Sequence, residues 1–281
     1  PNVGKSTLMN ALVGEKLSII TSKAQTTRHR IMGIVSGEDF QIVYSDTPGI
    51  LKPSYKLQES MMKFVTGALT DADVILYVTD TVEQSERSAE IVDSIRRSGI
   101  PTVVVINKID LSTPEALDAL VDKWRQELPE AQIVPASAKE NFNIEGLFRT
   151  ILSLLPEGPA FYPKDTLTDK TLRFFASEII REKILKFYDK EIPYCCEIEI
   201  ESYKEEPTID RISATIYVAR DSQKGILIGH KGEKLKRVGQ TAREDMEQFL
   251  GKKVFLQLFV KVSDDWRNNE RQLRRFGYEQ E

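Results

Sequence analysis

Short apolar runs rich in β-branched residues alternate with segments of helical periodicity from residue 1 to about residue 155. The apolar runs predict strands at Phe40–Tyr44, Val74–Val78, Thr102–Ile106 and Ile133–Val134. The periodic segments predict helices near 54–69, 84–98, 114–127 and 144–154. Because strands that alternate with helices pair mostly in parallel, the pattern predicts an α/β domain with a mainly parallel sheet.

The pattern changes after a cluster of residues that break helices and strands: Pro156, Gly158, Pro159 and Pro163. We therefore predict a first domain over 1–155, a linker over 156–170 and a second domain over 171–281. The later pattern predicts a helix near 171–188, strands near 195–203 and 209–219, helices within 224–250, a strand near 253–262 and a terminal helix near 264–276. This order indicates an α+β domain.

Composition and charge are those of a globular protein, with 41% hydrophobic and 29% charged residues in a chain of 281. The net charge of −4 gives no overall argument for nucleic-acid binding, which must rest on local charge. We expect no membrane-spanning helix, because no apolar run is long enough. The adjacent Cys195 and Cys196 have the wrong geometry for an ordinary disulfide, which favours a reducing, cytoplasmic setting.

One predicted strand has an acidic face. Glu197, Glu199 and Glu201 alternate with Cys196, Ile198 and Ile200. Because successive side chains of a strand point to opposite faces of the sheet, we expect these glutamates to lie on a solvated face.

A phosphate-binding loop is indicated by the first residues of the chain. Pro1-Asn2-Val3-Gly4-Lys5-Ser6-Thr7 matches the end of the pattern G-x-x-x-x-G-K-[ST], so we expect a preceding segment with the first glycine and the first strand. Gly4 lets the backbone approach phosphate, and Lys5 reaches the β and γ oxygens. Ser6 is expected to ligate Mg²⁺, and all seven residues are predicted to bind GTP.

A second motif, Asp46-Thr47-Pro48-Gly49, follows the apolar run that ends at Tyr44. This position places the Asp46 carboxylate at the carboxyl end of a strand, where ligands of open α/β sheets bind. There Asp46 can hold Mg²⁺ through water, and the Gly49 N–H can bond the γ-phosphate. We predict Thr47, Pro48, Gly49 and Ile50 as further GTP-binding residues.

The motif Asn107-Lys108-Ile109-Asp110 ends a predicted strand and selects the base. The Asp110 carboxylate can accept hydrogen bonds from N1–H and the 2-amino group of guanine, which adenine does not offer. Asn107 is expected to hold the loop and the base edge, and the stem of Lys108 to cover the ring. The segment Ser137-Ala138-Lys139 completes the predicted guanine site with its backbone N–H.

These four motifs stand in the order and spacing of Ras-like translation-factor GTPases, so the domain resembles a P-loop GTPase. Between the first two motifs, Gln25-Thr26-Thr27-Arg28-His29 lies in a polar, loop-like stretch and resembles the switch I segment of the Era and TrmE group. The resemblance implies Thr27 as the threonine that ligates Mg²⁺ in the GTP state, with Thr26 as the alternative. We expect His29, beside Arg28, to be solvated or to face RNA, and we assign neither residue a catalytic role.

Ile50 stands where Ras carries the glutamine that orients the attacking water. An isoleucine cannot orient water, so we assign no catalytic residue and expect slow intrinsic hydrolysis. The missing group would come from another part of the protein, from K⁺ as in some relatives, or from a partner such as the ribosome.

In the second domain Gly229-His230-Lys231-Gly232 matches the G-x-x-G loop of KH domains and precedes a basic helix. Ile226, Leu227 and Ile228 suit the apolar wall of a groove for unpaired bases, and the local excess of positive charge favours phosphate. We predict RNA binding by Lys224, Gly225, Ile226, Ile228, Gly229, His230, Lys231, Gly232, Lys234, Lys236 and Arg237.

One GTPase domain followed directly by a type II KH domain resembles the Era family over nearly all of the chain. The resemblance implies Mg²⁺ with GTP or GDP, a 16S-type ribosomal RNA 3′ end and the maturing 30S subunit as partners, a monomer, and a cytoplasmic location with peripheral membrane contact. Two other interpretations are an RNA-binding assembly factor that has lost hydrolysis, and a GTPase that acts on a membrane or protein partner with the tail as a docking module.

Overall fold

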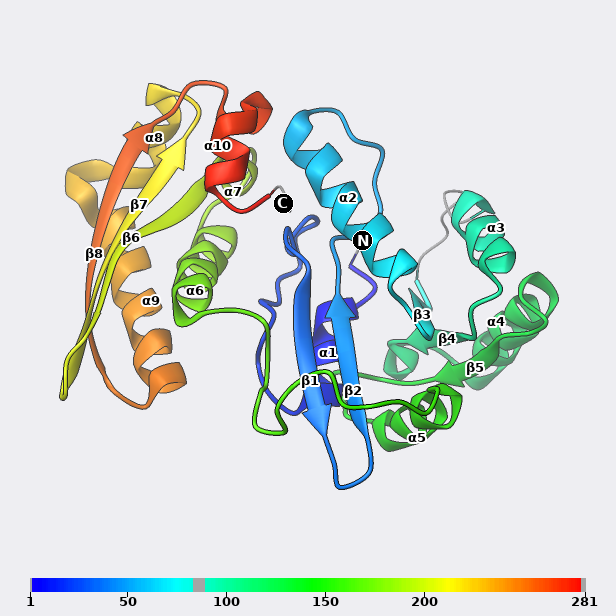
Figure 1. The fold of residues 1–281 in the computed structure, drawn as a ribbon. Coiled ribbons are helices and arrows are strands. Elements are labelled where there is room, and N and C mark those ends of the chain that lie inside the picture. The colour runs from blue at the N-terminus through cyan, green and yellow to red at the C-terminus, as the bar shows by residue number, and fades with distance from the viewer. Residues whose placement is uncertain (1, 83–88, 279–281) are drawn as a thin grey trace. The chain divides into compact units, whose positions relative to one another are not determined.

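The chain folds into two compact units, and the computed structural model describes residues 2–82 and 89–278 (Figure 1). The first unit comprises Pro1–Ser18, Arg30–Gly49 and Phe64–Asp169. The second comprises Ile19–His29, Ile50–Lys63 and Lys170–Glu281. Two segments from the first half of the sequence therefore fold with its C-terminal part. The domain limits at 155 and 171 stay a prediction.

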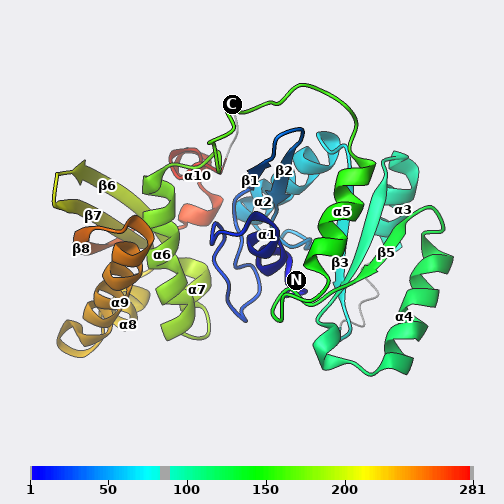
Figure 2. The ribbon, with the colours of Figure 1, turned by 90° about the horizontal axis from the view of Figure 1, so that it is seen from below.

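Three parallel strands form the centre of the first unit: β3 (Ile75–Asp80), β4 (Thr102–Asn107) and β5 (Gln132–Pro135), in that order. All six residues of β4 are buried, as expected for an apolar strand covered on both faces. Figure 2 shows α5 (Ile144–Leu154) on one side of the strands, and α3 (Ala89–Ser98) and α4 (Pro114–Glu127) on the other. The predicted α/β class with a parallel sheet is confirmed.

One helix of this unit, α4, begins where the sequence provides a side-chain cap. At the start of α4, the Thr113 side chain accepts a hydrogen bond from the Ala116 N–H, and Pro114 occupies the first turn. Trp124 and Leu128 then pack with Val104 and Ile106 in one buried cluster. The carboxyl ends of β3, β4 and β5 are thereby held at one edge of the unit.

A separate antiparallel hairpin, β1 (Ile31–Ser36) and β2 (Gln41–Asp46), was only half predicted. The prediction missed β1, whose apolar run is interrupted by Gly33. A Cβ on Gly33 would lie 2.6 Å from Val13 Cγ2 at the end of α1 (Lys5–Val13). The missing side chain therefore allows β1 to pack closely on α1.

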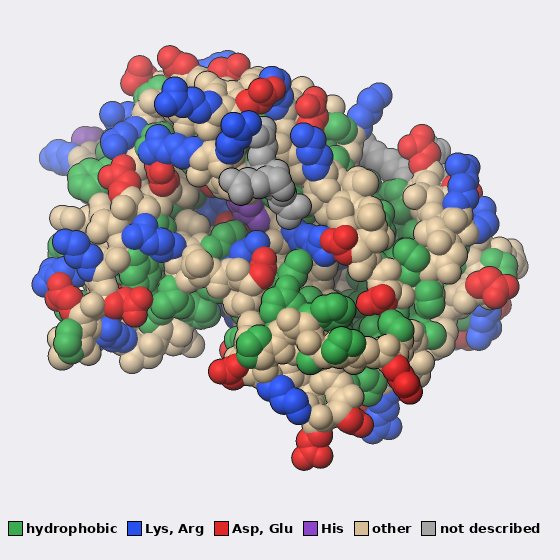
Figure 3. Space-filling view, viewed as in Figure 1, with side chains coloured by type: hydrophobic (Ala, Val, Ile, Leu, Met, Phe, Trp, Pro, Cys, Tyr) green, Lys and Arg blue, Asp and Glu red, His purple; other side chains and the backbone are tan. Residues whose placement is uncertain are grey.

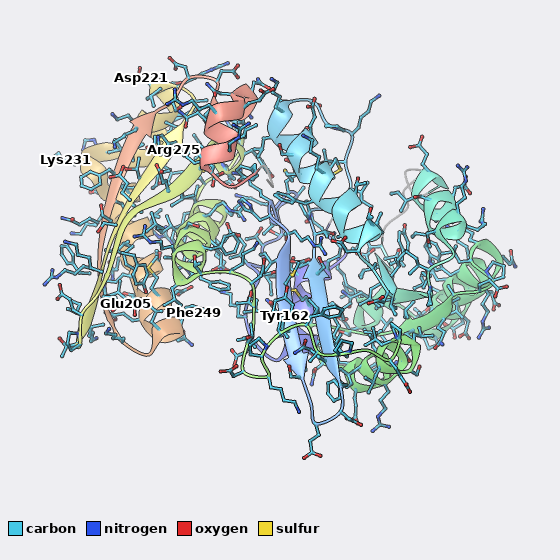
Figure 4. All side chains as sticks on the ribbon, in the orientation of Figure 1. Tyr162, Glu205, Asp221, Lys231, Phe249 and Arg275 are labelled. Atoms are coloured by element: carbon cyan, nitrogen blue, oxygen red, sulfur yellow. The ribbon has the colours of Figure 1, made fainter. Side chains whose placement is uncertain are left out.

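The proline-rich linker is bound along this hairpin. The Gln41 carboxamide oxygen accepts from the Phe161 and Tyr162 N–H groups at 2.8 and 2.9 Å, and Ile34 N donates to Leu167 O at 2.8 Å. Tyr162, labelled in Figure 4, donates through its hydroxyl to Met32 Sδ at 3.5 Å. The linker is thus ordered and is held against β1 and β2 by hydrogen bonds.

The second unit contains a sheet of three strands in the order β6 (Glu197–Glu205), β7 (Ile209–Val218), β8 (Lys253–Val262). β6 and β7 are antiparallel, and β7 and β8 are parallel. In Figure 1 α6 (Leu172–Phe187) and α9 (Glu233–Leu250) lie along one face of the sheet. The remaining elements are α7 (Ile192–Cys195), α8 (Asp221–Ile228) and α10 (Glu270–Arg275), with α2 (Lys56–Thr70) divided between the units.

Each of the last two predicted helical segments contains a break. The segment 224–250 forms α8 and α9, because Gly229, Lys231 and Gly232 have positive φ of 73°, 49° and 79°, which end one helix before the next begins. The terminal segment forms a 3₁₀ turn, Trp266–Asn268, and then α10. The first break falls at the predicted G-x-x-G loop, whereas the second, at Asn269, was not predicted.

The expected solvated glutamate face is wrong for Glu197. Its side chain is buried and ion-paired with Arg28, with Nη1 to Oε2 at 3.0 Å. Glu199 binds Arg275, labelled in Figure 4, at 2.8 and 2.5 Å. Glu201 accepts from Thr215 Oγ1 at 2.5 Å. Segments distant in sequence supply these partners, so the strand alone could not predict them.

Cys195 and Cys196 are free and buried. Burial raises the pKa of Cys195 to about 11 and that of Cys196 to about 12. Both are therefore protonated at neutral pH and unreactive.

Within 2–82 and 89–278, the helices include none that is long and apolar enough to cross a bilayer.

Candidate nucleotide and nucleic-acid sites

The loop before α1 is shaped by Gly4 and by a side chain from β4. Gly4 has φ 95°, and a Cβ there would lie 2.3 Å from Asn107 Nδ2. That amide nitrogen donates to Val3 O at 2.8 Å, and the Gly4 carbonyl accepts from Leu8 N at 2.9 Å. The loop therefore requires glycine for its backbone angle and for the approach of Asn107. Pro1 lies outside the described residues.

Asn107 joins this loop to a second one. Its Oδ1 accepts from the Ala138 N–H at 3.0 Å, while its Nδ2 binds Val3. Both groups of the buried amide are thus bonded to backbone. Asn107 holds the loops together, which is the loop-holding role that the sequence predicted.

The Asp110 carboxylate is exposed and oriented by Ser137. Ser137 Oγ donates to Asp110 Oδ1 at 2.6 Å, and the buried Ser137 backbone pairs with Phe142 across a tight turn. An exposed carboxylate with one hydrogen-bonded oxygen suits recognition of two adjacent N–H donors. Ala138 is buried, and Lys139 is exposed beside Glu140 at 3.0 Å.

Lys108 crosses from β4 to the phosphate-binding loop. Its Nζ donates to Asn2 O and to Asp80 Oδ2, both at 2.6 Å. Asp80, at the end of β3, is buried and was missed by the sequence analysis. A carboxylate at the carboxyl end of a parallel strand was the signal that could have identified it. The pair fixes the stem of Lys108, which was predicted to cover a base.

Oxygen ligands for a hard cation are present in the first unit. Ser6 is half-buried in the first turn of α1, and Asp46 is buried at the end of β2, followed by Thr47, Pro48 and Gly49. A hydroxyl and a carboxylate, with phosphate oxygens and water, form the ligand set that Mg²⁺ prefers. The residues therefore fit a magnesium nucleotide.

Lys5 and Thr7 lie in the first turn of α1, in the first unit, whereas Thr26, Thr27 and Ile50 lie in the second unit. Thr27 is buried, and the Thr26 hydroxyl bonds both Thr21 Oγ1 and Lys23 O at 2.6 Å. Ile50 is 40% exposed. The expectation that His29 is solvated or faces RNA is wrong, because its ring packs against Tyr278 and Phe174. The neighbouring Arg28 side chain is buried among partners from β6 and the segment before it. Burial lowers the pKa of His29 to about 3, so this histidine is neutral.

The predicted RNA loop is a sharp turn between α8 and α9. A Cβ on Gly229 would lie 2.7 Å from Lys234 Cγ, whereas a Cβ on Gly232 would meet no atom within 4 Å. Lys231 projects at the edge of the unit in Figure 4, where Figure 3 shows several basic side chains. The other predicted residues around this turn are His230, Lys234, Lys236 and Arg237, with Lys224 and Gly225 before it.

A groove of about 410 Å³ begins at Gly232 and runs between α9 and β8. The predicted wall was wrong for Leu227, which is fully buried in the core, while Ile226 is exposed and Ile228 is half-buried. Gly232 and Lys236, which were predicted to bind RNA, line the groove together with Arg243, which belongs to the predicted local excess of positive charge. The other lining residues were missed by the prediction: Leu235, Gly239, Gln240, Leu256 and Leu258. Apolar residues on an exposed strand beside basic helix positions were a weak signal for it.

Comparisons with known proteins match one family in the first part of the chain and another in its last part. Residues 1–108 match a family described as 50S ribosome-binding GTPase, and residues 191–267 match the KH domain family. GTPase Era of Alkaliphilus metalliredigens is 45% identical over 99% of this chain and 96% of its own. GTPase Era of Staphylococcus haemolyticus is 44% identical over 99% and 94%.

Solved structures agree along the whole chain. Era in complex with MgGDPNP and nucleotides 1506–1542 of 16S ribosomal RNA has a TM-score of 0.95 at 41% identity, covering 100% of this chain and 96% of that one. A variant of Aquifex aeolicus Era bound to GDP and AlF₄⁻ has a TM-score of 0.96 at 41% identity and the same coverage. The chain is a GTP-hydrolysing enzyme with a KH domain, and it belongs to the Era family of GTPases.

Proposed function

We propose that the chain is a GTP-driven switch whose KH domain binds single-stranded RNA near the 3′ end of small-subunit ribosomal RNA during maturation of the 30S subunit. The observation that carries the proposal is the groove that opens at Gly232 beside basic residues, in the same chain as the guanine-selecting Asp110. The proposal is supported by the similar Era structure with a TM-score of 0.95, which is a complex with MgGDPNP and 16S ribosomal RNA nucleotides.

The nucleotide roles follow from chemistry. Lys5 would neutralise the β and γ oxygens, the N–H groups from Asn2 to Thr7 would bind phosphate, and Gly49 would detect the γ-phosphate. Asp110, with Ser137, Ala138 and Lys139, would bind guanine. Hydrolysis adds water to the γ-phosphorus of GTP, breaks its bond to the β–γ bridging oxygen, and releases GDP and phosphate.

Magnesium would neutralise the charge of the phosphates, held by Ser6, by Asp46 through water, and by a threonine of the Ile19–His29 loop. Thr27 is preferred to Thr26 for this role. The Thr26 hydroxyl donates to Lys23 O and also bonds Thr21 Oγ1, which uses most of its hydrogen-bonding capacity.

The proposal is tested by binding of a short RNA with the sequence of the small-subunit 3′ end. Filter binding with a non-hydrolysable GTP analogue, with GDP and without nucleotide measures both sites and their coupling. We expect tighter RNA binding with the GTP analogue than with GDP. RNA affinity that is the same in all three states would contradict the switch, and absent RNA binding would contradict the ligand.

Asp110→Asn is expected to lower GTP affinity by about 10²-fold or more and to favour xanthine nucleotides, because an amide N–H can bond the xanthine carbonyl that replaces the guanine amino group. The carbonyl oxygen of the new amide could still accept from Ser137. Displacement of a fluorescent guanine nucleotide by GTP and XTP measures the change. Asp122→Asn, which alters an exposed pair with Arg125, is the control. Unchanged base preference in the Asp110 variant would argue against this base site.

Ile50→Gln is not expected to create a fast enzyme. The single-turnover rate should stay far below the roughly 10²-fold gain that a positioned group contributes, because a glutamine orients water only where neighbouring groups fix its own side chain. Ile50→Leu controls for the loss of the branched side chain. A rate increase of that size in Ile50→Gln, but not in Ile50→Leu, would refute the expectation that a glutamine at position 50 is insufficient for fast hydrolysis.

Further proposals rest on the resemblance to the family. K⁺, another part of the protein or a ribosomal partner would supply the catalytic group that residue 50 does not. The chain would act as a monomer in the cytoplasm, with peripheral contact to the inner face of the cell membrane. Measurement of the rate in K⁺ and in Na⁺ buffers separates the cation from the other sources.

A further inference from the structure

The loop Ile19–His29, which carries Thr26 and Thr27, is held by residues of the KH domain and its C-terminal extension. All belong to one compact unit. In Figures 1 and 2 this loop runs beside α6, from which Arg181 Nη2 donates to Thr26 O at 2.6 Å. The Arg181 guanidinium is itself fixed by Glu178 at 2.7 and 2.6 Å.

Arg28 forms the principal anchor, which we call the Arg28 clamp: Arg28, Glu197 and Tyr278. Arg28 Nη1 donates to Cys196 O at 2.8 Å and to Glu197 Oε2 at 3.0 Å, and Nη2 donates to Pro193 O at 3.1 Å. The Tyr278 hydroxyl donates to the same Glu197 oxygen at 2.6 Å. The Arg28 and Glu197 side chains are 3% and 8% exposed.

His29 extends the clamp through its ring. It stacks on Tyr278 with centroids 4.3 Å apart and meets the Phe174 edge at 5.5 Å. Burial keeps His29 neutral by lowering its pKa, so no second positive charge lies next to Arg28 in the sequence. The loop is thus joined to α6, to β6 and to the end of the chain.

A buried ion pair of this kind specifies an arrangement more than it adds stability. Withdrawing two charges from water is costly, and the cost is offset only when each polar atom finds its partner. The three acceptors of Arg28 lie in positions 193–197, so displacement of the loop would separate them from the guanidinium. A surface pair would impose no such constraint.

We infer that the Arg28 clamp makes the KH domain a positioning element for GTP binding: Arg28, Glu197 and Tyr278 hold the threonine-bearing loop ordered before the γ-phosphate arrives. The inference rests on the proposed role of that loop. Without the clamp, ordering of the loop would oppose binding of GTP, whereas GDP, which lacks the γ-phosphate, would be indifferent.

The sequence supplies a matched control. Tyr217, Glu199 and Arg275 repeat the three residue types and the contacts among their side chains, in a more exposed setting with Arg275 at 49% and Glu199 at 24%. Tyr217 donates to Glu199 at 3.0 Å, and Arg275 binds both. This second triad joins α10 to β6 and β7 and has no residue in the Ile19–His29 loop. Tyr217→Phe and Glu199→Gln therefore alter the same chemistry in the same domain at a different place.

The test compares Tyr278→Phe and Glu197→Gln with Tyr217→Phe and Glu199→Gln in the full chain. We expect the clamp variants to lower the ratio of affinities for a GTP analogue and GDP by about tenfold, with GDP affinity and nucleotide-free RNA affinity unchanged. The control variants should keep the parental ratio. An unchanged or increased ratio in the clamp variants, or an equal fall in the controls, would overturn the inference.

Hydrogen exchange gives a second measurement, which does not depend on whether the Glu197→Gln variant folds. In the parent without nucleotide, amides of residues 19–29 should exchange slowly, and in Tyr278→Phe they should exchange faster than in Tyr217→Phe. Rapid exchange of this loop in the parent would contradict preordering. If the parent does not prefer GTP over ATP, the proposed function is contradicted. If the parent is specific for GTP but the clamp variants keep its ratio of affinities, only the inference about the clamp is contradicted.

Discussion

Gly4→Ala is expected to reduce affinity for GTP and for GDP by about 10²-fold or more, because a displacement of about 1 Å in a binding loop already has effects of that size. The new Cβ would lie 2.3 Å from Asn107 Nδ2, which bonds Val3 O. Asn107 would move, and with it the loop of Ala138 that its Oδ1 holds. Both the phosphate and the base sides of the site would therefore be disturbed.

Gly14→Ala is the matched control at the other end of α1. Gly14 has φ 81°, similar to the 95° of Gly4, but a Cβ there would meet no atom within 4 Å. Each variant should lose roughly 1 kcal/mol of stability from its left-handed backbone. Titration with a fluorescent GDP and thermal unfolding separate the two effects. If both variants bind nucleotide alike, the contact with Asn107 has no role in the site.

The sequence alone predicted those features that depend on residues close together in the chain. The run Thr102–Ile106 predicted β4 because a strand buried on both faces needs no alternation, and the helix 144–154 was predicted with the bounds that α5 has. The loop chemistry around Gly4 and Asp110 was predictable for a related reason. The residue types within each short motif specify its chemistry.

The features that were missed depend on contacts between distant segments. The burial of Arg28 was not predicted, because nothing within its polar stretch indicates Glu197, which follows far along the chain. The groove beside Gly232 needs Leu256 and Leu258 of β8 to face α9, and their apolar character alone predicts only a strand. Asp80 was missed because its partner Lys108 lies far along the chain, just after the next strand.

Gly232→Asp is expected to lower RNA affinity by about 10²-fold while leaving nucleotide binding intact, because it adds a carboxylate where the phosphate backbone approaches a helix N-terminus. Gly232 lines the groove, and a Cβ there would meet no atom within 4 Å. The expected loss is therefore electrostatic rather than steric. It should shrink as salt concentration rises, because salt screens exposed charges.

Gly251→Asp makes the same change at the other end of α9. Gly251 has φ 63° and equally open space, so the backbone strain is alike. An acidic residue is disfavoured near a helix C-terminus, which makes this control the more destabilising of the two. A fall in RNA affinity confined to Gly232→Asp therefore cannot result from weakened folding. Equal binding by both variants would mean that RNA is bound away from the turn at Gly229–Gly232.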